Sequence, residues 1–462
     1  MTLYTALLSV FVVIQLAVGL WIGRRMRGAN DFFVAGRSLP APLIFGTFLA
    51  ANIGAGSTIG AASLGYSVGL GGWWWNASAG LGSLVFAFWA GPRLWALAQE
   101  NGFLTLGDFL EWRYGGSIRA VTSVLIWFVS LSILAGQLLG ASSILQVVAG
   151  LPRWVGAVTA AGVVVVYFVA GGLLSSAWVN LVQLAVKLSG FAIALPLALS
   201  TVGGWAGLRT AEALPDRFFD ATGGSGATLW LLALLAPAFI VSPGLVQKAY
   251  AAADARAVRL GVGVNAVALL LFAIVPVTLG MVARIHHPGL PSADLALPVL
   301  LRSDLPPLVG ALTLASVFAA EMSAADAVLF MLSTSLSQDL YRRFMAPAAD
   351  DARLVQVARW SAGVAAAAGL GMALVLPTVV DALKIFYSVL TVALFVPVVG
   401  GLLWARPTSA EALSAMAIGL SAMLVTYLVS GGQGVGGIPP VVAGLVGASV
   451  GFGGAAAMRG AR

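Results

Sequence analysis

The sequence predicts an all-α protein that crosses a membrane about thirteen times. Three observations predict this fold class. Of the 462 residues, 60% are hydrophobic and only 9% are charged, against about 25% charged in a soluble domain. The apolar residues form runs of about 20, the length that a helix needs to cross the hydrocarbon core. The basic residues stand between these runs, so the net charge of +7 indicates membrane topology and not nucleic-acid binding.

The predicted spans lie close together, so the chain is expected to be one transmembrane domain. They are centred roughly on residues 13, 52, 83, 132, 161, 187, 237, 270, 320, 366, 391, 420 and 446. The first run, residues 3–22, has full spanning length and no clear cleavage site after it, which predicts a retained helix and no signal peptide. With the N-terminus outside, seventeen basic residues fall in inner loops and five in outer loops. This asymmetry predicts a bacterial inner-membrane protein with a cytoplasmic C-terminus.

Two predicted spans contain residues that a plain membrane helix avoids. The second span carries ANIGAGSTIG at 51–60, in which three glycines lower helix stability and Asn52, Ser57 and Thr58 add polar groups. The seventh span carries Pro243, which removes a helix hydrogen bond. In lipid, backbone groups freed in this way must be bound by protein, water or a ligand. Both helices are therefore predicted to be discontinuous.

The two interruptions lie five spans apart, in helices of opposite direction. This arrangement is expected of two five-helix repeats with inverted topology, and paired discontinuous helices mark a binding site near the middle of the membrane. The alternative is that glycine and proline serve only close helix packing. We expect a binding site between the two breaks.

Five stretches resemble the sodium/solute symporter family, which includes sodium/glucose, sodium/proline and sialic acid carriers. They are DFFVAGR (31–37), ANIGAG (51–56) with GGWWWN (71–76), GGLL (171–174) with Trp178 and Gln183, Ser242-Pro243 with Gln247 and Tyr250, and AAEMSAADAVLFMLSTSLSQDLY (319–341). The resemblance extends over nearly the whole chain. It implies a secondary active symporter that couples a cation, Na⁺ in this family, to uptake of a small polar organic solute by alternating access.

The resemblance also implies a leucine-transporter-type fold, a 5+5 inverted repeat in which the first and sixth core helices are broken. Residues 1–30 would then hold an extra N-terminal helix. Residues 38–200 and 226–404 would form the two repeats, and residues 408–462 the peripheral C-terminal helices.

A main sodium site of oxygen ligands follows from the same resemblance, as a hard cation requires. Its ligands would be the carbonyl groups of Ala50, Ile53 and Ala320 and the side chains at the positions of Ser323 and Ala324. Alanine has no hydroxyl, so this chain lacks one ligand of the family pattern. A water would have to replace it.

A second cation site in some members uses an aspartate on the fifth core helix. Here that position is Asn180, while Asp326 stands three residues after Ser323 and so on the same helix face. One interpretation is that the carboxylate has moved across a second cation or proton site. The other is that Asn180 and Asp326 only hydrogen-bond each other. An ionisable residue inside the membrane favours a function.

Lys187 and Glu321 also fall deep inside predicted spans. Lys187 lies seven residues after Asn180, which is two turns along the same face, or about 10 Å. Its ammonium group could therefore replace the sodium ion, which would make the carrier Na⁺-independent and either proton-coupled or uncoupled. The alternatives are a structural pair of Lys187 with Glu321 or Asp326, or a side chain that extends to the membrane interface.

The resemblance places the solute between the two breaks. Asn52 and Ser57 match positions that contact the sugar in the bacterial sugar carrier, and Phe239 and Ser242 are candidates from the sixth core helix. Trp74 stands where that carrier has a glutamate, so a simple sugar is less expected here. Trp74 and its two neighbouring tryptophans offer flat faces for a ring or a cation, or form an aromatic belt at the membrane interface.

Two other functional classes are disfavoured by the sequence. A membrane enzyme would need a nucleophile–base pair or a metal cluster, but the chain has no cysteine and its two histidines are adjacent. A membrane sensor on this fold would carry a signalling module, which no stretch of the sequence resembles. The expected partners are a small polar organic solute and the lipid bilayer, without nucleic acid. The sequence does not indicate an oligomeric state.

Overall fold

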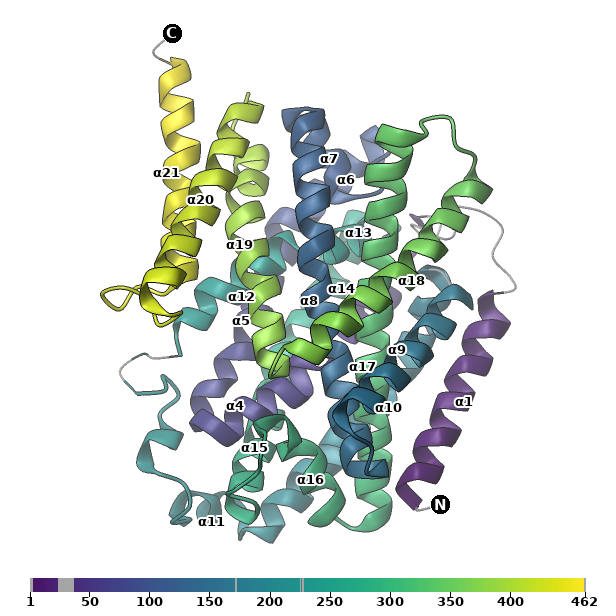
Figure 1. Ribbon diagram of the computed structural model, residues 1–462, viewed down its shortest axis with the longest axis vertical. Helices are drawn as coiled ribbons and strands as arrows, with labels where there is room; N and C mark the ends of the chain where they lie inside the picture. The colour runs from purple at the N-terminus through teal and green to yellow at the C-terminus, as the bar shows by residue number, and fades with distance from the viewer. Residues whose placement is uncertain (1–2, 24–36, 171–172, 225, 227, 461–462) are drawn as a thin grey trace.

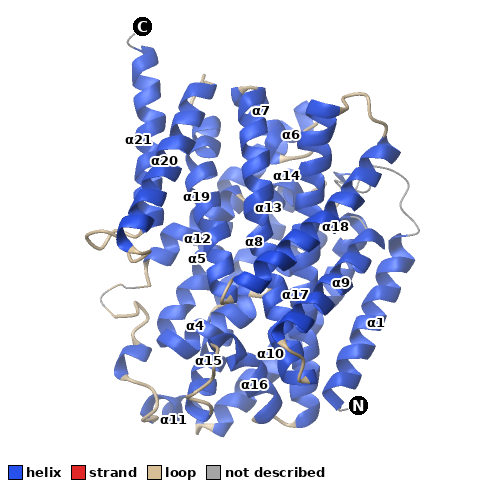
Figure 2. Cartoon of the chain, in the orientation of Figure 1, coloured by secondary structure: helices blue, strands red, loops and turns tan. Residues whose placement is uncertain are grey.

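The computed structural model describes residues 3–23, 37–170, 173–224, 226 and 228–460. Within these ranges the chain is helical and contains no strand beyond isolated bridges (Figure 2). The all-α prediction is confirmed. Ten helical stretches are long and apolar enough to cross a membrane, and shorter apolar helices accompany them. The count of thirteen crossings stays a prediction, as does the division at 1–30, 38–200, 226–404 and 408–462.

The first predicted break is present. Helix α3 (Ala41–Asn52) ends before three non-helical residues, and the chain continues as the π-helix η2 (Gly56–Gly60) and as α4 (Ala61–Val68). Gly54 lies in the break, where a Cβ atom would be only 2.4 Å from the Cβ of Ala324. Only glycine allows the backbone to approach its neighbour this closely. The break is therefore pressed against the helix that carries Ala324.

The second predicted break is present as well. Helix α12 (Trp230–Val241) ends at Ser242, whose backbone is not helical (φ −57°, ψ 120°), and α13 (Pro243–Tyr250) begins with the proline. Proline suits the first position of a helix because its missing N–H has no partner there. The prediction of broken first and sixth core helices is confirmed.

The remaining helices surround these two broken ones (Figure 1). Their bounds are α1 (Leu3–Gly23), η3 (Gly69–Gly72), α5 (Trp73–Val85), η4 (Phe86–Ala90), α6 (Gly91–Asn101), α7 (Leu106–Tyr114), α8 (Gly116–Ala149), α9 (Arg153–Ala170), α10 (Leu173–Thr201), α11 (Gly204–Thr210), η5 (Asp216–Phe219), α14 (Ala255–Phe272), α15 (Ile274–His286), η6 (Ala293–Leu295), α16 (Ala296–Ser303), α17 (Pro307–Thr334), η7 (Ser335–Met345), α18 (Asp351–Val375), α19 (Val379–Leu403), α20 (Ser409–Ser430) and α21 (Pro440–Gly460).

Two sets of helices pack together around the breaks. The broken helices pack with α5 and α14, while α8, α9, α17 and α18 pack with one another. Helix α10 contacts both α3 of the first set and α17 of the second, and α19 contacts both α12 and α8. The middle of the molecule is therefore a boundary between two helix sets, with α10 and α19 across it.

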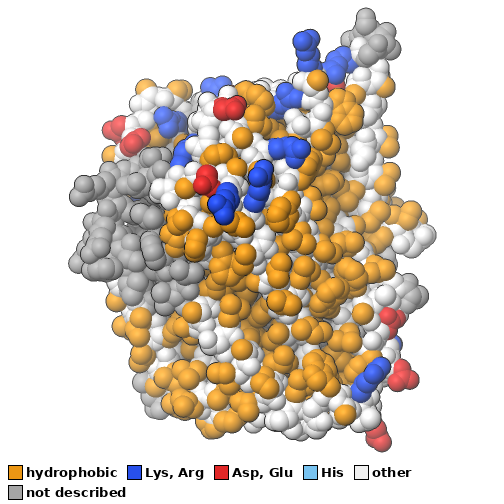
Figure 3. Space-filling model, turned by 180° about the vertical axis from the view of Figure 1, so that it is seen from behind, with side chains coloured by type: hydrophobic (Ala, Val, Ile, Leu, Met, Phe, Trp, Pro, Cys, Tyr) orange, Lys and Arg blue, Asp and Glu red, His pale blue; other side chains and the backbone are white. Residues whose placement is uncertain are grey.

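The outer surface fits a lipid environment. Figure 3 shows a face covered largely by hydrophobic side chains, with Lys and Arg gathered mainly at the end drawn at the top. The N- and C-termini lie at opposite ends of the molecule (Figure 1). This is a multi-pass membrane protein, and which end faces the cytoplasm stays a prediction.

Candidate cation and solute sites

The Lys187 ammonium group contacts two of the five residues predicted to form the main cation site, Ile53 and Ser323. The side chain is fully buried on α10. Its Nζ donates to Ser323 Oγ over 2.7 Å and to the Ile53 carbonyl over 3.4 Å. Ser323 Oγ in turn lies 3.3 Å from the Ala50 carbonyl and 3.1 Å from the Ala320 carbonyl. The break after α3 exposes carbonyl groups that have no partner within the helix, so the ammonium lies where oxygens converge.

No carboxylate neutralises Lys187 at close range. None of the ion pairs in the described part of the chain includes Lys187. Ala324 contributes only a methyl group beside Gly54. The oxygens that contact the Lys187 ammonium are therefore neutral, and neutral oxygens can accept from an ammonium group or bind a small hard cation.

Glu321 lies elsewhere on α17 and contacts a different part of the break. Its Oε1 accepts a hydrogen bond of 2.8 Å from Thr58 Oγ1, and its Oε2 is buried without a hydrogen-bond partner among the described residues. Gly140 of α8 leaves room for it, because a Cβ there would lie 3.1 Å from Glu321 Oε2. Lys187 and Glu321 influence each other electrostatically but form no ion pair within 4 Å.

The second candidate cation site stays a prediction. Asp326 is buried on α17 and takes part in interactions within the chain. One of these is electrostatic, with buried Lys248 of α13. The side chain of Asn180 lies outside the described residues, as do the family-like residues 31–36, Trp178 and Gln183.

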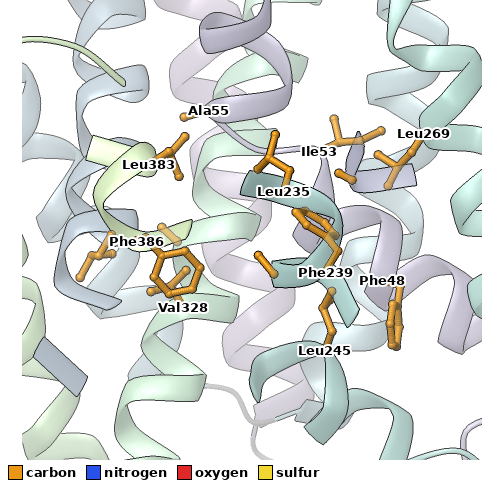
Figure 4. Close-up of a cluster of buried hydrophobic side chains, with 14 of the residues drawn as sticks. Phe48, Ile53, Ala55, Leu235, Phe239, Leu245, Leu269, Val328, Leu383 and Phe386 are labelled. Atoms are coloured by element: carbon orange, nitrogen blue, oxygen red, sulfur yellow. The ribbon is translucent and has the colours of Figure 1, made fainter. Parts of the chain in front are cut away.

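A pocket lies between the two helix breaks. Figure 4 shows part of its apolar surroundings, with Ile53 and Ala55 from the first break near Leu235 and Phe239 of α12 and Leu383 of α19. The lining residues are Ala51, Asn52, Gly54, Gly56, Ser57, Trp75, Asn76, Ala79, Ile133, Gln137, Leu235, Phe239, Leu383 and Tyr387. Three predicted solute residues, Asn52, Ser57 and Phe239, are among them.

Two other predicted solute residues are placed differently. Trp74 does not line the pocket; its indole N–H donates to the Ala221 carbonyl over 3.0 Å, and its ring contacts Trp73. The neighbouring Trp75 lines the pocket in its place. Ser242 lies at the break between α12 and α13 but is not part of the pocket lining.

The sequence reasoning missed three pocket residues. Gln137 accepts a hydrogen bond of 2.8 Å from the Ala55 N–H, and Asn76 donates to the Ser57 carbonyl over 3.0 Å. Tyr387 of α19 joins the pocket from a helix without any motif. A polar side chain within a long apolar helix was the available signal for Gln137. No local signal pointed to Tyr387.

The pocket is small. Its cavity volume is about 20 Å³, little more than one water requires. The Tyr387 ring packs 6.2 Å from the Trp75 ring and 5.6 Å from the Phe239 ring, measured between centroids. These three rings occupy the space between the breaks, so a solute has to displace them.

A larger cavity, of about 280 Å³, lies away from the breaks at the end of the molecule where α7 meets η7. Arg119 in its wall bonds three carboxylates at 2.7 to 2.8 Å; they belong to Asp108, Glu111 and Asp339. Although burial alone would raise the pKa of Glu111, hydrogen bonds from Arg343 and Arg119 lower it. We refer to Arg119 and its three carboxylate partners, Asp108, Glu111 and Asp339, as the Arg119 cluster.

Asp294 is a buried carboxylate in the loop between two candidate spans, 255–286 and 307–345. Its Oδ2 accepts from the Val379 N–H over 2.9 Å, and the Ser63 side chain also hydrogen-bonds the carboxylate, while Oδ1 has no partner within the described part of the chain. Burial raises the pKa of Asp294 to about 6. Its short helix η6 packs against η2, α4 and α8, so this residue joins the loop to the first broken helix.

Comparisons with known proteins agree with this architecture. A family model described as "Sodium:solute symporter family" matches residues 32–419. The chain is 26% identical over 397 residues to a sodium/glucose cotransporter of Vibrio parahaemolyticus, covering 77% of this chain and 72% of the relative. It is 26% identical over 426 residues to a sodium/pantothenate symporter of Escherichia coli, covering 86% and 84%.

A solved structure shares the fold over the full length. The structure of a Na⁺-coupled sialic acid symporter, described as a substrate-bound outward-open state, has a TM-score of 0.84 to this chain. It covers 99% of this chain and 98% of its own, at 17% sequence identity.

Proposed function

The chain belongs to the sodium:solute symporter family, and we propose that it carries a small polar organic solute into the cell together with a cation by alternating access. Its family is one of secondary transporters that couple Na⁺ to solute movement. Relatives named as carriers of glucose and pantothenate support a small organic solute as the cargo. The buried pocket between two broken helices supports a binding site at mid-membrane.

Na⁺ is the first candidate for the coupling ion. Ser323 Oγ lies within 3.3 Å of the carbonyl groups of Ala50 and Ala320, and it shares the Lys187 ammonium with the Ile53 carbonyl. This is the oxygen set that a hard cation needs. Sodium would take this position only when the Lys187 ammonium is absent from it, because the two cations would occupy the same volume.

A second candidate is favoured by one observation, the 2.7 Å hydrogen bond from Lys187 Nζ to Ser323 Oγ. In this alternative the ammonium group itself is the cation at the site. Loading and unloading of a proton on Lys187 would then replace the binding and release of sodium, since a buried lysine readily changes its charge. The carrier would be Na⁺-independent and either proton-coupled or uncoupled.

Transport by the reconstituted protein tests both candidates. Proteoliposomes containing a pH-sensitive dye would be given glucose, proline, pantothenate or uracil under an inward Na⁺ gradient or an inward H⁺ gradient. Accumulation only with Na⁺ supports sodium coupling, while accumulation with internal acidification in Na⁺-free buffer supports the lysine alternative. Asp326→Asn tests whether the second site matters. Accumulation of no solute under either gradient contradicts the proposal.

We also propose that the protein lies in a bacterial inner membrane with its N-terminus outside and its C-terminus in the cytoplasm. The excess of basic residues in the predicted inner loops supports this orientation. The chain has no cysteine, so a single cysteine introduced near either terminus can be labelled selectively. Labelling of the C-terminal cysteine by an impermeant reagent in intact cells would contradict the orientation.

A further inference from the structure

We infer that the pocket selects an uncharged solute with a flat ring that carries both hydrogen-bond donors and acceptors. The inference rests on the proposed function, because it names the solute class for the same site. It follows from three properties of the lining: its charge, its remaining hydrogen-bonding groups and its aromatic rings.

The lining carries no charge at neutral pH. Its polar side chains are Asn52, Ser57, Asn76, Gln137 and Tyr387, Trp75 adds an indole N–H, and no lining residue is acidic or basic. Moving a charged group from water into such a pocket costs several kcal/mol unless an opposite charge meets it. An anionic or cationic solute would therefore bind without compensation from the lining.

The first helix break has few free backbone N–H groups that could bind a carboxylate. Helix N-termini normally bind anions through unpaired N–H groups. Here the N–H of Ala55 donates to Gln137 Oε1, and the N–H groups of Ser57 and Thr58 donate to the Gly54 carbonyl at 3.0 and 3.1 Å. These three donors are already used. A zwitterion such as an amino acid is disfavoured for the same reason.

The amide side chains leave a defined set of groups for the solute. Asn52 Nδ2 donates to Asn265 Oδ1 over 3.1 Å, which leaves the Asn52 oxygen as an acceptor. Asn76 Nδ2 donates to the Ser57 carbonyl, which leaves its oxygen as well. Gln137 has its oxygen bonded by Ala55, so only its NH₂ donors remain. A neutral lactam or carboxamide edge, with N–H beside C=O, complements this mixture.

Three aromatic rings fill the rest of the pocket. The Tyr387 ring contacts both the Trp75 ring and the Phe239 ring. A flat ring that enters can exchange these ring–ring contacts for ring–solute contacts of the same kind. A sugar brings more hydroxyl groups than the remaining amide groups can match, and each unmatched group costs free energy. Tyr387 is therefore the residue that should determine specificity for flat solutes.

Ligand-dependent thermal unfolding of the detergent-purified full chain tests the inference. The flat neutral probes are uracil and hydantoin, and the comparison probes are glucose, choline and proline. A ligand that binds only the folded state raises the melting temperature by mass action. We expect a rise with at least one flat probe and none with the three comparison probes. A rise with glucose, choline or proline but with neither flat probe, or a rise with no probe, overturns the inference.

Matched variants locate the binding. Tyr387→Ala should weaken the affinity for the flat probe by about tenfold, as loss of one stacking ring does, whereas Tyr387→Phe should keep most of it. Tyr427→Ala is the control, because Tyr427 lies exposed on α20. Equal affinity in Tyr387→Ala and the parent would overturn the assignment. Binding of uracil without any coupled flux would refute the proposed coupling and leave this inference standing. Coupled uptake of glucose alone would support the coupling and refute this inference.

Discussion

Buried charged residues have different partners in the Arg119 cluster and in the middle of the molecule, between the helix breaks. In the cluster, one arginine directly bonds the carboxylates of Asp108, Glu111 and Asp339 at 2.7 to 2.8 Å. In the middle, Lys187 bonds a hydroxyl and a carbonyl, and the one side-chain partner of Glu321 among the described residues is the Thr58 hydroxyl. Two residues of opposite charge thus lie near each other without forming an ion pair.

The difference separates structural from functional charge. A buried charge that is bonded directly by groups of opposite charge holds helices in place. A buried charge that is surrounded by neutral oxygens has the environment of a bound ion, and it is costly enough inside a membrane to indicate a function. On this basis we regard the Arg119 cluster as a structural link between α7, α8 and η7. We propose that the coupled cation binds at the Lys187 position.

The largest effect is expected from breaking the cluster. Arg119→Met would leave three carboxylates without their shared partner, and removing one member of a buried ion pair typically costs about 3–5 kcal/mol. We expect a large fall in melting temperature in detergent, or failure to accumulate in the membrane. Arg119→Lys, which keeps the charge, should recover part of the loss. A melting temperature within one degree of the parent would mean that the cluster is not structural.

A pH-dependent effect of intermediate size is expected at Asp294, the buried carboxylate with one unpartnered oxygen. Its pKa is raised from 3.8 to about 6 by burial. The protonated form is therefore favoured in the folded state. The stability contribution is present below pH 3.8 and is lost as the pH rises through about 6. The loss is at most about 3 kcal/mol, at roughly 1.36 kcal/mol per unit of pKa.

Melting curves of the parent and of Asp294→Asn between pH 4.5 and 8 measure this effect. The parent should lose stability relative to the variant as the pH rises, because asparagine stays neutral and can still accept from the Val379 N–H. A difference between the two proteins that does not change with pH would contradict the raised pKa.

A smaller effect is expected at Thr58, which donates the only hydrogen bond to Glu321 within the described part of the chain. Thr58→Val keeps the shape of the side chain but removes the donor. Leaving a buried acceptor unsatisfied costs about 1–3 kcal/mol. Thr58→Ser should retain the bond and most of the stability. If the valine and serine variants have the same melting temperature, the Thr58–Glu321 hydrogen bond contributes nothing to stability.

The smallest effect is expected at the rim of the cluster. Arg343 bonds Glu111 at 2.5 Å, but half of its side chain is exposed. Exposed ion pairs contribute about 0–1 kcal/mol and are screened by salt. Arg343→Ala should therefore shift the melting temperature only slightly. A loss as large as that of Arg119→Met would place the stability of the cluster at its rim and not at Arg119.

Much of this fold was predictable because its signals are local. Gly54 and Pro243 disturb a helix wherever they occur, so both breaks could be predicted from single runs of sequence. The spacing from Asn180 to Lys187 likewise predicts position along one helix. The main cation position combines such local information with the resemblance to the family.

The pocket was less predictable because it depends on helix rotation and on distant partners. Trp75 and not its neighbour Trp74 lines the pocket, and which of the two faces inward depends on the rotation of α5. Tyr387 and Gln137 reach the pocket from α19 and α8, which are far apart in sequence. Their roles arise only when the helices are packed.

The most direct test of the account is the effect of sodium on stability with and without Lys187. Melting temperatures of the parent and Lys187→Met would be compared in sodium and potassium chloride, at about pH 6 and pH 8. If the ammonium takes the place of the ion, the parent should show no sodium-specific rise at pH 6. Lys187→Met should gain one, worth about 2.7 kcal/mol at a concentration of 100 Kd. A sodium-specific rise in the parent that is unchanged in Lys187→Met would contradict the claim that the ammonium takes the place of the ion.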